Sequence, residues 1–150
     1  MFNKILVPLD GSDLAECVFP YVEDIAKIRT SMVELVTVFE PFEMPPHGGM
    51  VFDEENEKEY NECSKKNAEA YIQKIKGRFQ SKGIDTESAI LVGKVDKSLV
   101  DYANDHDFDL IVMATHGRSG VERWIMGSIA DKLIHYSTTP VLLIRAMHQK

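Results

Sequence analysis

Five short apolar runs alternate with longer stretches whose apolar residues recur at helical spacing. The runs predict strands at residues 5–7, 32–39, 87–92, 108–113 and 141–144. The stretches between them predict helices after Ser12, over 57–82, around 99–103 and over 128–136. Each predicted strand except the last is followed by a helix, and this order is typical of a parallel sheet covered on both faces.

The predicted order indicates an α/β fold in one domain that spans residues 1–150. We expect a doubly wound, five-stranded parallel sheet with strand order 3-2-1-4-5 and helices on both faces. In such sheets ligands bind beyond the carboxyl ends of the strands, where the winding direction reverses, which here lies between the first and fourth strands. Asp10 and the loop that begins at Ala114 would then face each other across one crevice.

The first predicted helix begins with several capping residues and contains a proline. Ser12 or Asp13 can cap its N-terminus, and Glu16 is spaced to complete a capping box with Asp13. Pro20 would then lie inside the helix, where the loss of a hydrogen bond predicts a kink and a cost of about 3 kcal/mol. Gly83 is expected to end the long helix over 57–82.

A long irregular stretch separates the second strand from the second helix. Residues 41–56 contain Pro and Gly pairs, followed by the start of a dense acidic run. This composition predicts a solvated loop that leads into the first turns of the helix. The alternative is a flap that lies beside a ligand.

Gly117, Gly120 and Gly127 lie between the fourth strand and the last helix. A glycine loop in that position lets backbone N–H groups converge on an anion at the positive end of the helix dipole. Ser128 is the expected N-cap of the helix, and Asp131 three residues later supports that assignment. The pattern therefore predicts a phosphate cradle, and a nucleotide is the first ligand to test.

The run Ala114-Thr115-His116-Gly117, followed after nine residues by Gly127-Ser128, resembles the signature of the ATP-binding subgroup of the universal stress protein (UspA-like) family. That signature is a glycine, two residues, a second glycine, nine residues, and a third glycine before Ser or Thr. Residues 5–12, 93–103 and 140–144 are similar to the family's first strand and turn, third loop and helix, and last strand. The likeness covers essentially the whole chain and implies the adenine nucleotide alpha hydrolase-like fold.

Ala114 departs from the signature, which has its first glycine at that position. If the position requires a positive φ, alanine adds strain on the order of 1 kcal/mol. If it requires only a small side chain near the ligand, the methyl group is tolerated.

The resemblance also implies which residues hold the nucleotide. Asp10 falls where the family binds ribose; its alternative role is to cap the turn that follows. Thr37 and Val38 match the position that holds adenine through backbone groups, or else they are ordinary sheet residues. Arg118 would neutralise terminal phosphates or be solvated. Together, the residues implied to contact the ligand are Pro8, Leu9, Asp10, Thr37, Val38, Ala114, Gly117, Arg118, Gly127, Ser128 and Ile129.

The implied ligand is ATP, alone or with Mg²⁺ or Mn²⁺, and no metal ligand is assigned. His116 is a candidate general base for hydrolysis, but no carboxylate is placed to orient it, and a turn residue is the alternative. The chain has no Walker lysine, HExxH or GxSxG pattern, so no catalytic residue is assigned. We expect an ATP-binding regulatory module of the stress response with at most slow hydrolysis. The alternatives are a nucleotide-free dimeric interaction module of the same fold and a slow ATP hydrolase that uses His116 or Asp10.

The amino-acid composition limits the kinds of molecule that the chain is expected to bind. The chain has 24 Asp and Glu against 17 Lys and Arg, a net charge of −7, which argues against binding to nucleic acids or anionic membranes. Cys17 and Cys63 form no CxxC pair, no signal peptide is visible, and no apolar run approaches the roughly 20 residues that span a bilayer. A cytoplasmic location is therefore expected. The resemblance implies a homodimer through the last strand, whose edge holds Val141 and Leu143, besides an unidentified protein partner.

Overall fold

The structure is a computed structural model that describes residues 1–43, 54–116 and 125–146. Within these residues, the sheet has five parallel strands in the order β3-β2-β1-β4-β5, which confirms the predicted fold class. The strands are β1 (Lys4–Pro8), β2 (Met32–Phe39), β3 (Thr86–Val92), β4 (Leu110–His116) and β5 (Val141–Ala146). The helices are α1 (Phe19–Arg29), α2 (Glu54–Ser81), α3 (Val95–Asp105) and α4 (Ile125–Tyr136).

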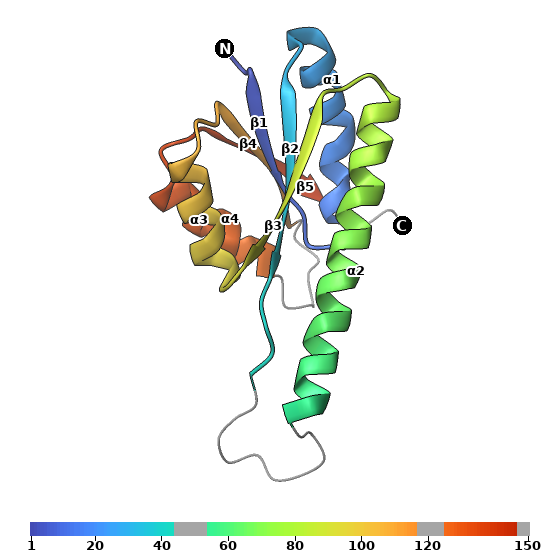
Figure 1. Cartoon of the computed structure of the whole chain (residues 1–150). Helices are drawn as coiled ribbons and strands as arrows, with labels where there is room; N and C mark the ends of the chain where they lie inside the picture. Colours follow the sequence, from blue (N-terminus) through green and yellow to red (C-terminus); the bar gives the residue numbers. More distant parts are fainter. Residues whose placement is uncertain (44–53, 117–124, 147–150) are drawn as a thin grey trace.

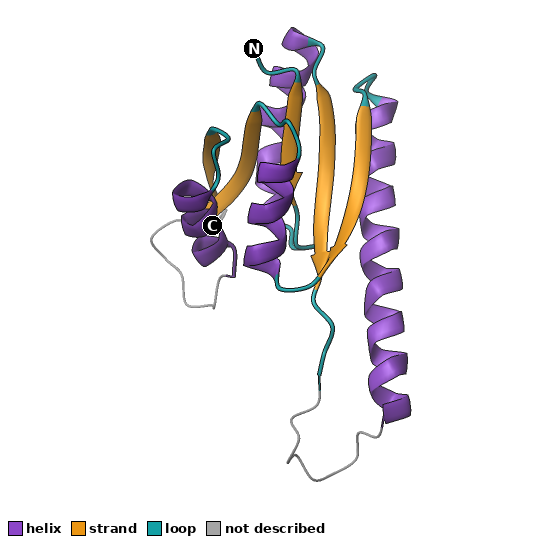
Figure 2. Ribbon diagram, turned by 60° about the vertical axis from the view of Figure 1, so that its left-hand side comes forward, coloured by secondary structure: helices purple, strands orange, loops and turns teal. Residues whose placement is uncertain are grey.

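Two apolar cores lie on opposite faces of the sheet, because side chains alternate along each strand. The helices α1 and α2 cover one face, and α3 and α4 cover the other (Figures 1 and 2). In β1, Ile5 and Val7 belong to the first core and Leu6 to the second. Phe19 and Phe79 pack in the first core with almost perpendicular rings whose centroids lie 5.2 Å apart.

The helix α1 begins later than the pattern predicted. A short 3₁₀ helix, Ala15–Val18, precedes it, and α1 itself begins at Phe19. Pro20 therefore lies in the first turn, where its fixed φ suits the helix and its missing N–H has no intrahelical partner to lose. The kink predicted at Pro20 is wrong for this reason.

The capping box predicted between Asp13 and Glu16 is also wrong. The Ser12 hydroxyl accepts a hydrogen bond from the backbone N–H of Ala15 at 3.2 Å. The Glu16 carboxylate instead accepts a hydrogen bond from the Tyr71 hydroxyl of α2, also at 3.2 Å. Glu16 thus ties the segment after β1 to α2 rather than to the start of its own helix.

The helix α2 begins at Glu54, three residues before its predicted start, so most of the acidic run is helical. It ends at Ser81, and Gly83 follows with a φ of 76°, as predicted for the residue that stops this helix. With 28 residues α2 is long, yet no helix of the described ranges is both long and apolar enough to cross a membrane. Residues 44–53, most of the predicted loop or flap over 41–56, lie outside the described residues.

Two boundaries near the predicted phosphate cradle differ from the prediction. The strand β4 continues to His116, which pairs with Ala146 of β5, so the turn predicted at His116 is wrong. The helix α4 begins at Ile125, three residues before Ser128, so the N-cap predicted at Ser128 is also wrong. The remaining cradle residues, which lie outside the described ranges, are Gly117, Arg118 and Gly120.

Candidate functional site

A cavity of about 250 Å³ opens at the carboxyl ends of β1 and β2, between these strands and the helices α3 and α4. Val95 and Leu99 of α3 form one side of it. The other lining residues are all among those that the sequence predicted to contact a ligand: Pro8, Leu9, Asp10, Thr37, Val38 and Ile129. The cavity therefore lies at the edge of the sheet where open α/β folds bind their ligands.

The end of β2 presents backbone polar groups to this cavity. The ladder between β1 and β2 ends at the pair Pro8–Val36, and its last bond runs from the Leu9 N–H to the Val36 carbonyl at 2.8 Å. In a parallel ladder alternate residues direct their N–H and C=O groups toward the same neighbouring strand. Val38 therefore directs one donor and one acceptor toward the side of β1, beyond the residue at which β1 ends. A purine edge offers the complementary pair.

Asp10 is exposed and lies at the lining of the cavity. Its Oδ1 accepts hydrogen bonds from the N–H and the hydroxyl of Ser12, at 2.9 and 2.5 Å. Asp10 thus performs the turn-capping role that we set against ribose binding. The two roles are compatible, because an ionised carboxylate has about four acceptor positions and Oδ2 is available to a ligand.

Thr37 contributes to the cavity in a different way from Val38. Alternation along β2 places its side chain on the same face as Val33 and Leu35, which belong to the core under α1 and α2. Thr37 is 7% exposed, and its Oγ1 has no hydrogen-bond partner among the described residues. Thr37 therefore lines the cavity without directing its hydroxyl into it, and buries that unsatisfied hydroxyl on the opposite face of the sheet.

The side chain of Ala114 also points away from the cavity. Its methyl group is buried in the core under α1 and α2, in the same cluster as Ala15 and Val18. Among the described residues other than glycine, only Thr30 has a positive φ, so Ala114 adopts its conformation without the strain considered above. The departure from glycine at this position therefore distorts no backbone.

The first turns of α4 border the cavity. Ile129 is buried and lines it, while Gly127 is half-buried and Ser128 is exposed. Because α4 begins at Ile125, Gly127 lies in the first turn, where N–H groups lack intrahelical partners. The N–H of Ile129 instead falls within the helical ladder. The contacts expected of these three residues with phosphate stay a prediction.

Val95 and Leu99, which lie one turn apart at the start of α3, were not among the ligand contacts that the sequence predicted. Gly93 places this turn: it has a φ of 143° and donates its N–H to the Phe39 carbonyl at 3.0 Å. A Cβ at Gly93 would lie 2.9 Å from the Ser98 Oγ, which would have to shift, and a φ of 143° is one that other residues rarely adopt. The available signal was an apolar pair at i, i+4 directly after a strand-ending glycine, but core residues show the same pattern.

Charge is distributed unevenly around the cavity. The pKa of Tyr71 is raised well above its ordinary value, first by burial and then by the carboxylates of Glu16, Asp10 and Asp13. Negative charge thus gathers on the side of α2. A ligand with phosphate groups would place them on the other side, toward α4, where the first turn of the helix carries partial positive charge.

An ion pair joins the two helices on that side. Asp96 of α3 lies 3.3 Å from the Lys132 ammonium of α4. The backbone N–H of Lys97 and then Lys132 lower the pKa of the Asp96 carboxyl. Since Asp96 directly follows Val95, this pair holds the start of α3 against α4 beside the cavity.

In the described part of the chain, no three His, Cys, Asp or Glu side chains gather as metal ligands. Of the lining residues, Asp10 alone carries a carboxylate. A divalent cation here would need oxygens of the ligand itself to complete its coordination, as Mg²⁺ commonly does with phosphates.

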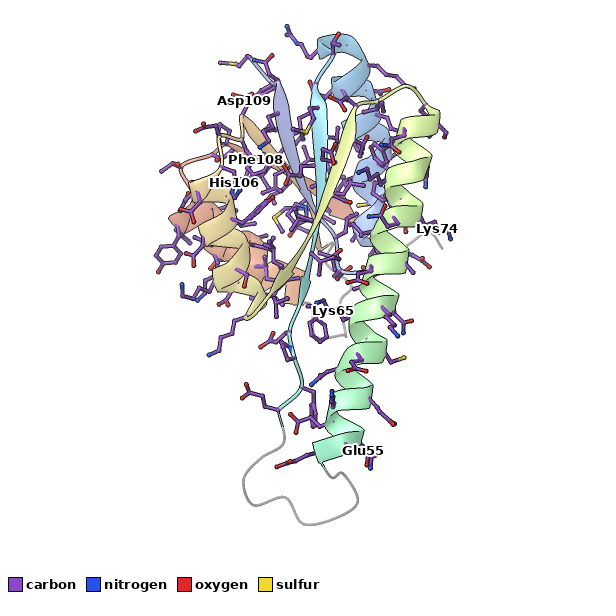
Figure 3. The ribbon with its side chains drawn as sticks, viewed as in Figure 1. Glu55, Lys65, Lys74, His106, Phe108 and Asp109 are labelled. Carbon is purple, nitrogen blue, oxygen red and sulfur yellow. The ribbon has the colours of Figure 1, made fainter. Side chains whose placement is uncertain are left out.

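Two larger hollows are more open than this cavity. One, of about 460 Å³, lies at the amino edge of the sheet beside His106, Phe108 and Asp109 (Figure 3). There the Nδ1 of His106 lies 2.9 Å from the Tyr102 carbonyl, and Asp109 accepts backbone N–H bonds, so these groups hold the local fold. The other, of about 540 Å³, lies between Phe39 and the start of α2. Neither is lined by a described residue that the sequence predicted as a ligand contact.

Comparison with known proteins gives one family. The model of the universal stress protein family matches residues 1–145. Universal stress protein MJ0531 of Methanocaldococcus jannaschii is 28% identical over 148 residues, which cover 97% of this chain and 83% of that protein. The solved structure of MJ0577, 25% identical, superposes with a TM-score of 0.80 and covers 99% of both chains.

Two of the similar solved structures are described as nucleotide complexes. A universal stress protein in complex with cAMP is 20% identical and has a TM-score of 0.70, with 97% of this chain and 98% of that chain covered. A family protein of Arabidopsis thaliana with AMP bound is 12% identical and has a TM-score of 0.69, with 97% and 93% covered. At these identities the likeness to this chain is one of fold.

Proposed function

Because the chain belongs to the universal stress protein family, we propose that it binds an adenine nucleotide, ATP, in the cavity at the carboxyl ends of β1 and β2. The observation that carries the proposal is the convergence of residues distant in sequence, Pro8–Asp10, Thr37–Val38 and Ile129, on one cavity. Nucleotides in two structures of the same fold support the ligand class.

The proposed binding mode assigns one part of the ligand to each wall. The adenine edge pairs with the backbone N–H and C=O of Val38, and the base lies against the apolar side chains of Val95 and Leu99 on one side of the cavity. The ribose hydroxyls donate to Asp10, whose other oxygen is held by Ser12. The cavity, with about 250 Å³, is smaller than the roughly 300–1,000 Å³ of a pocket for a drug-sized ligand. In the proposed mode the base and the ribose therefore fill it, and the phosphates lie outside.

The phosphates then extend toward the start of α4 and the signature residues. Gly127 and Ser128 approach them from the first turns of α4, and Ala114, Gly117 and Arg118 complete the proposed contacts. A Mg²⁺ or Mn²⁺ ion, where present, comes with the phosphates. Without a Walker lysine or an oriented base, hydrolysis is at most slow, and the bound nucleotide acts as an effector in a cytoplasmic stress response.

The proposal includes a homodimer through β5. Among the described strands, β5 has only β4 as a neighbour, and its Val141 and Leu143 are half-buried. The β5 strand of a second copy would pair with the backbone N–H and C=O groups at this open edge. Sedimentation of the protein as a monomer at high micromolar concentration would remove this part.

Calorimetric titration with ATP, ADP and AMP tests the proposal directly. Asp10→Asn removes a charge-assisted bond of about 1.5–3 kcal/mol, which corresponds to a loss of affinity of roughly 10- to 150-fold. The matched control is Asp107→Asn, an exposed carboxylate at the opposite end of the sheet, which should leave the affinity unchanged. Equal affinity of Asp10→Asn and the unaltered protein would overturn the ribose assignment.

A second pair of variants tests the base pocket. Val95→Phe places a ring in the cavity and should weaken ATP binding by more than tenfold, while Val92→Phe enlarges an exposed residue of β3 and should not.

The rival function is an interaction module that binds no nucleotide, and strain at Ala114 would have favoured it. Ala114 carries no such strain. Mass analysis of the gently denatured protein for a co-purified adenine nucleotide separates the two functions.

A further inference from the structure

An acidic arm projects from the carboxyl edge of the sheet. We define it as residues 40–43, which continue β2, and residues 54–63, the first turns of α2. In Figure 1 both segments run beyond the ends of the strands, and Figure 3 shows Glu55 near the far end of the helix and Lys74 where the helix runs beside the sheet. The arm is thus a surface of the molecule separate from the cavity.

The arm carries most of the net charge of the chain. Its residues, 40–43 and 54–63, contain seven Asp and Glu and one Lys, a net charge of −6 out of −7. The remaining residues contain 17 acidic and 16 cationic side chains, so their net charge is −1. The field of the protein is therefore concentrated at one projecting element, and it attracts a cationic partner to that element rather than to the surface at large.

Two exposed aromatic rings lie within this acidic surface. Phe42 and Tyr60 are 44% and 54% exposed, and their rings meet edge to face with centroids 5.9 Å apart. The Asn61 side chain holds them in place: its Oδ1 accepts from the Phe42 N–H at 2.8 Å and its Nδ2 donates to the Phe42 carbonyl at 3.1 Å. A fixed aromatic pair costs a partner little ordering entropy, and aromatic anchors dominate interface energies.

The inward face of α2 carries polar rather than apolar side chains in the arm. The half-buried positions of α2 continue toward its N-terminus at helical spacing, but the residues there are Glu57, Asn61 and Ser64. The first fully buried side chain is Ile72. The outward side chains Glu55, Glu59 and Glu62 are exposed.

We propose that the acidic arm is a docking surface for a Lys- and Arg-rich amphipathic segment of another protein. The carboxylates would pair with the cationic side chains, and Tyr60 and Phe42 would receive an apolar side chain or the face of a guanidinium group. The charge excludes a nucleic acid. A second copy of the chain does not fit, because its own arm repels this one and the rest of it has a net charge of −1.

The test uses the full chain and a fluorescent amphipathic peptide of Leu and Lys as the probe, with binding measured by anisotropy. Glu55→Gln, Glu59→Gln and Glu62→Gln combined should weaken binding about tenfold, and the loss should shrink as salt is raised. The control removes three exposed charges elsewhere, Asp24→Asn, Asp85→Asn and Asp105→Asn, and should change the affinity less than twofold.

A second experiment tests the aromatic pair of Phe42 and Tyr60. Tyr60→Ser should weaken the Leu and Lys peptide about fivefold at both low and high salt, whereas Tyr21→Ser, which alters a similarly exposed ring on α1, should not. Gln preserves helix propensity, and circular dichroism checks that each variant is folded. Two results would overturn the proposal: an equal loss of peptide affinity in the two triple variants, or no loss in Tyr60→Ser. Either would mean that the peptide responds only to the overall charge of the protein. Because the readout contains no nucleotide, its failure leaves the proposed function of the cavity untouched.

Discussion

The two halves of α2 share one backbone and one spacing of inward positions but differ in chemistry. In the half beside the sheet, those positions are Ile72, Ile75 and Phe79, all buried in the first core. In the arm they are Glu57 and Asn61, which are only half-buried. The comparison separates two requirements that usually coincide: helical periodicity sets which side chains face inward, and their polarity sets whether that face contributes to global stability.

The arm is helical for local reasons. Glu54, Glu55 and Glu57 lie in the first turn of α2, where they interact favourably with the helix dipole. Glu54 precedes Lys58 by four residues, a spacing worth about 0.2–0.5 kcal/mol on a helix surface. Such terms are small beside the burial of one aromatic ring, so the two halves should respond very differently to substitution.

The largest expected effect is the loss of Phe79. Phe79→Ala removes a fully buried ring that packs against Phe19, and it should lower the free energy of unfolding by about 3–5 kcal/mol. Tyr60→Ala, in the arm, should lower it by less than about 1 kcal/mol. Urea denaturation followed by circular dichroism measures both. Comparable losses would mean that the arm folds as part of the core.

A smaller effect of opposite sign is expected on the sheet face that the packed half of α2 covers. Thr37→Val replaces an unsatisfied buried hydroxyl by a methyl group of similar size and should stabilise the protein by about 1 kcal/mol. Ser31→Ala is the contrasting change, because the Ser31 hydroxyl donates to the Phe2 carbonyl and its loss should destabilise. Thermal unfolding of both variants checks the signs.

A local effect of about 1 kcal/mol is expected in the arm itself. Asn61→Ala removes both hydrogen bonds to the backbone of Phe42, so hydrogen exchange of the Phe42 amide should rise roughly fivefold. The midpoint of global unfolding should not move. Asn67→Ala, on the same helix with its amide 3.9 Å from the Cys63 Sγ, serves as the control and should leave that amide unchanged.

The smallest effect appears only at alkaline pH, at Tyr71. Burial and the nearby carboxylates raise its pKa in the folded protein above the ordinary value of 10.0. The folded state therefore retains a proton that the unfolded state releases above that pH, and the associated stability, complete below pH 10, declines as the pH rises further. Tyr71→Phe should flatten the fall in unfolding free energy between pH 9 and 11. An unchanged slope would contradict the assignment.

The alternation of strands and helices along the chain could be predicted because each element depends on features local to its own segment. The runs 5–7 and 32–39 are apolar throughout, as buried parallel strands require, and each is followed by a helical pattern. Element ends were less predictable. Thr115 and His116 belong to β4 because they pair with Arg145 and Ala146 of β5, residues that lie far along the chain.

The candidate site likewise contains residues that could be predicted from the sequence and residues that could not. Asp10 follows from the topology, since the carboxyl ends of adjacent strands meet at one edge, whereas Thr37 and Val38 came from the family resemblance. Val95 and Leu99 do not, because lining a cavity and filling a core both require apolar side chains. Pro20 was misplaced because the 3₁₀ helix before α1 has no distinct pattern of its own, so the start of α1 was set too early.

The backbone of β2 is hydrogen-bonded at several points close to the proposed nucleotide site. Within two residues of Val38 the strand is fastened on both sides, by the Leu9 N–H to the Val36 carbonyl and by the Gly93 N–H to the carbonyl of Phe39. Three residues on, Phe42 is clamped again. The described backbone from Val36 to Phe42 is thus held at three points between the proposed site and the arm. A partner would then detect the proposed nucleotide by contacting the nucleotide and the protein surface together, as a composite epitope. It would not depend on a change in the position of the arm.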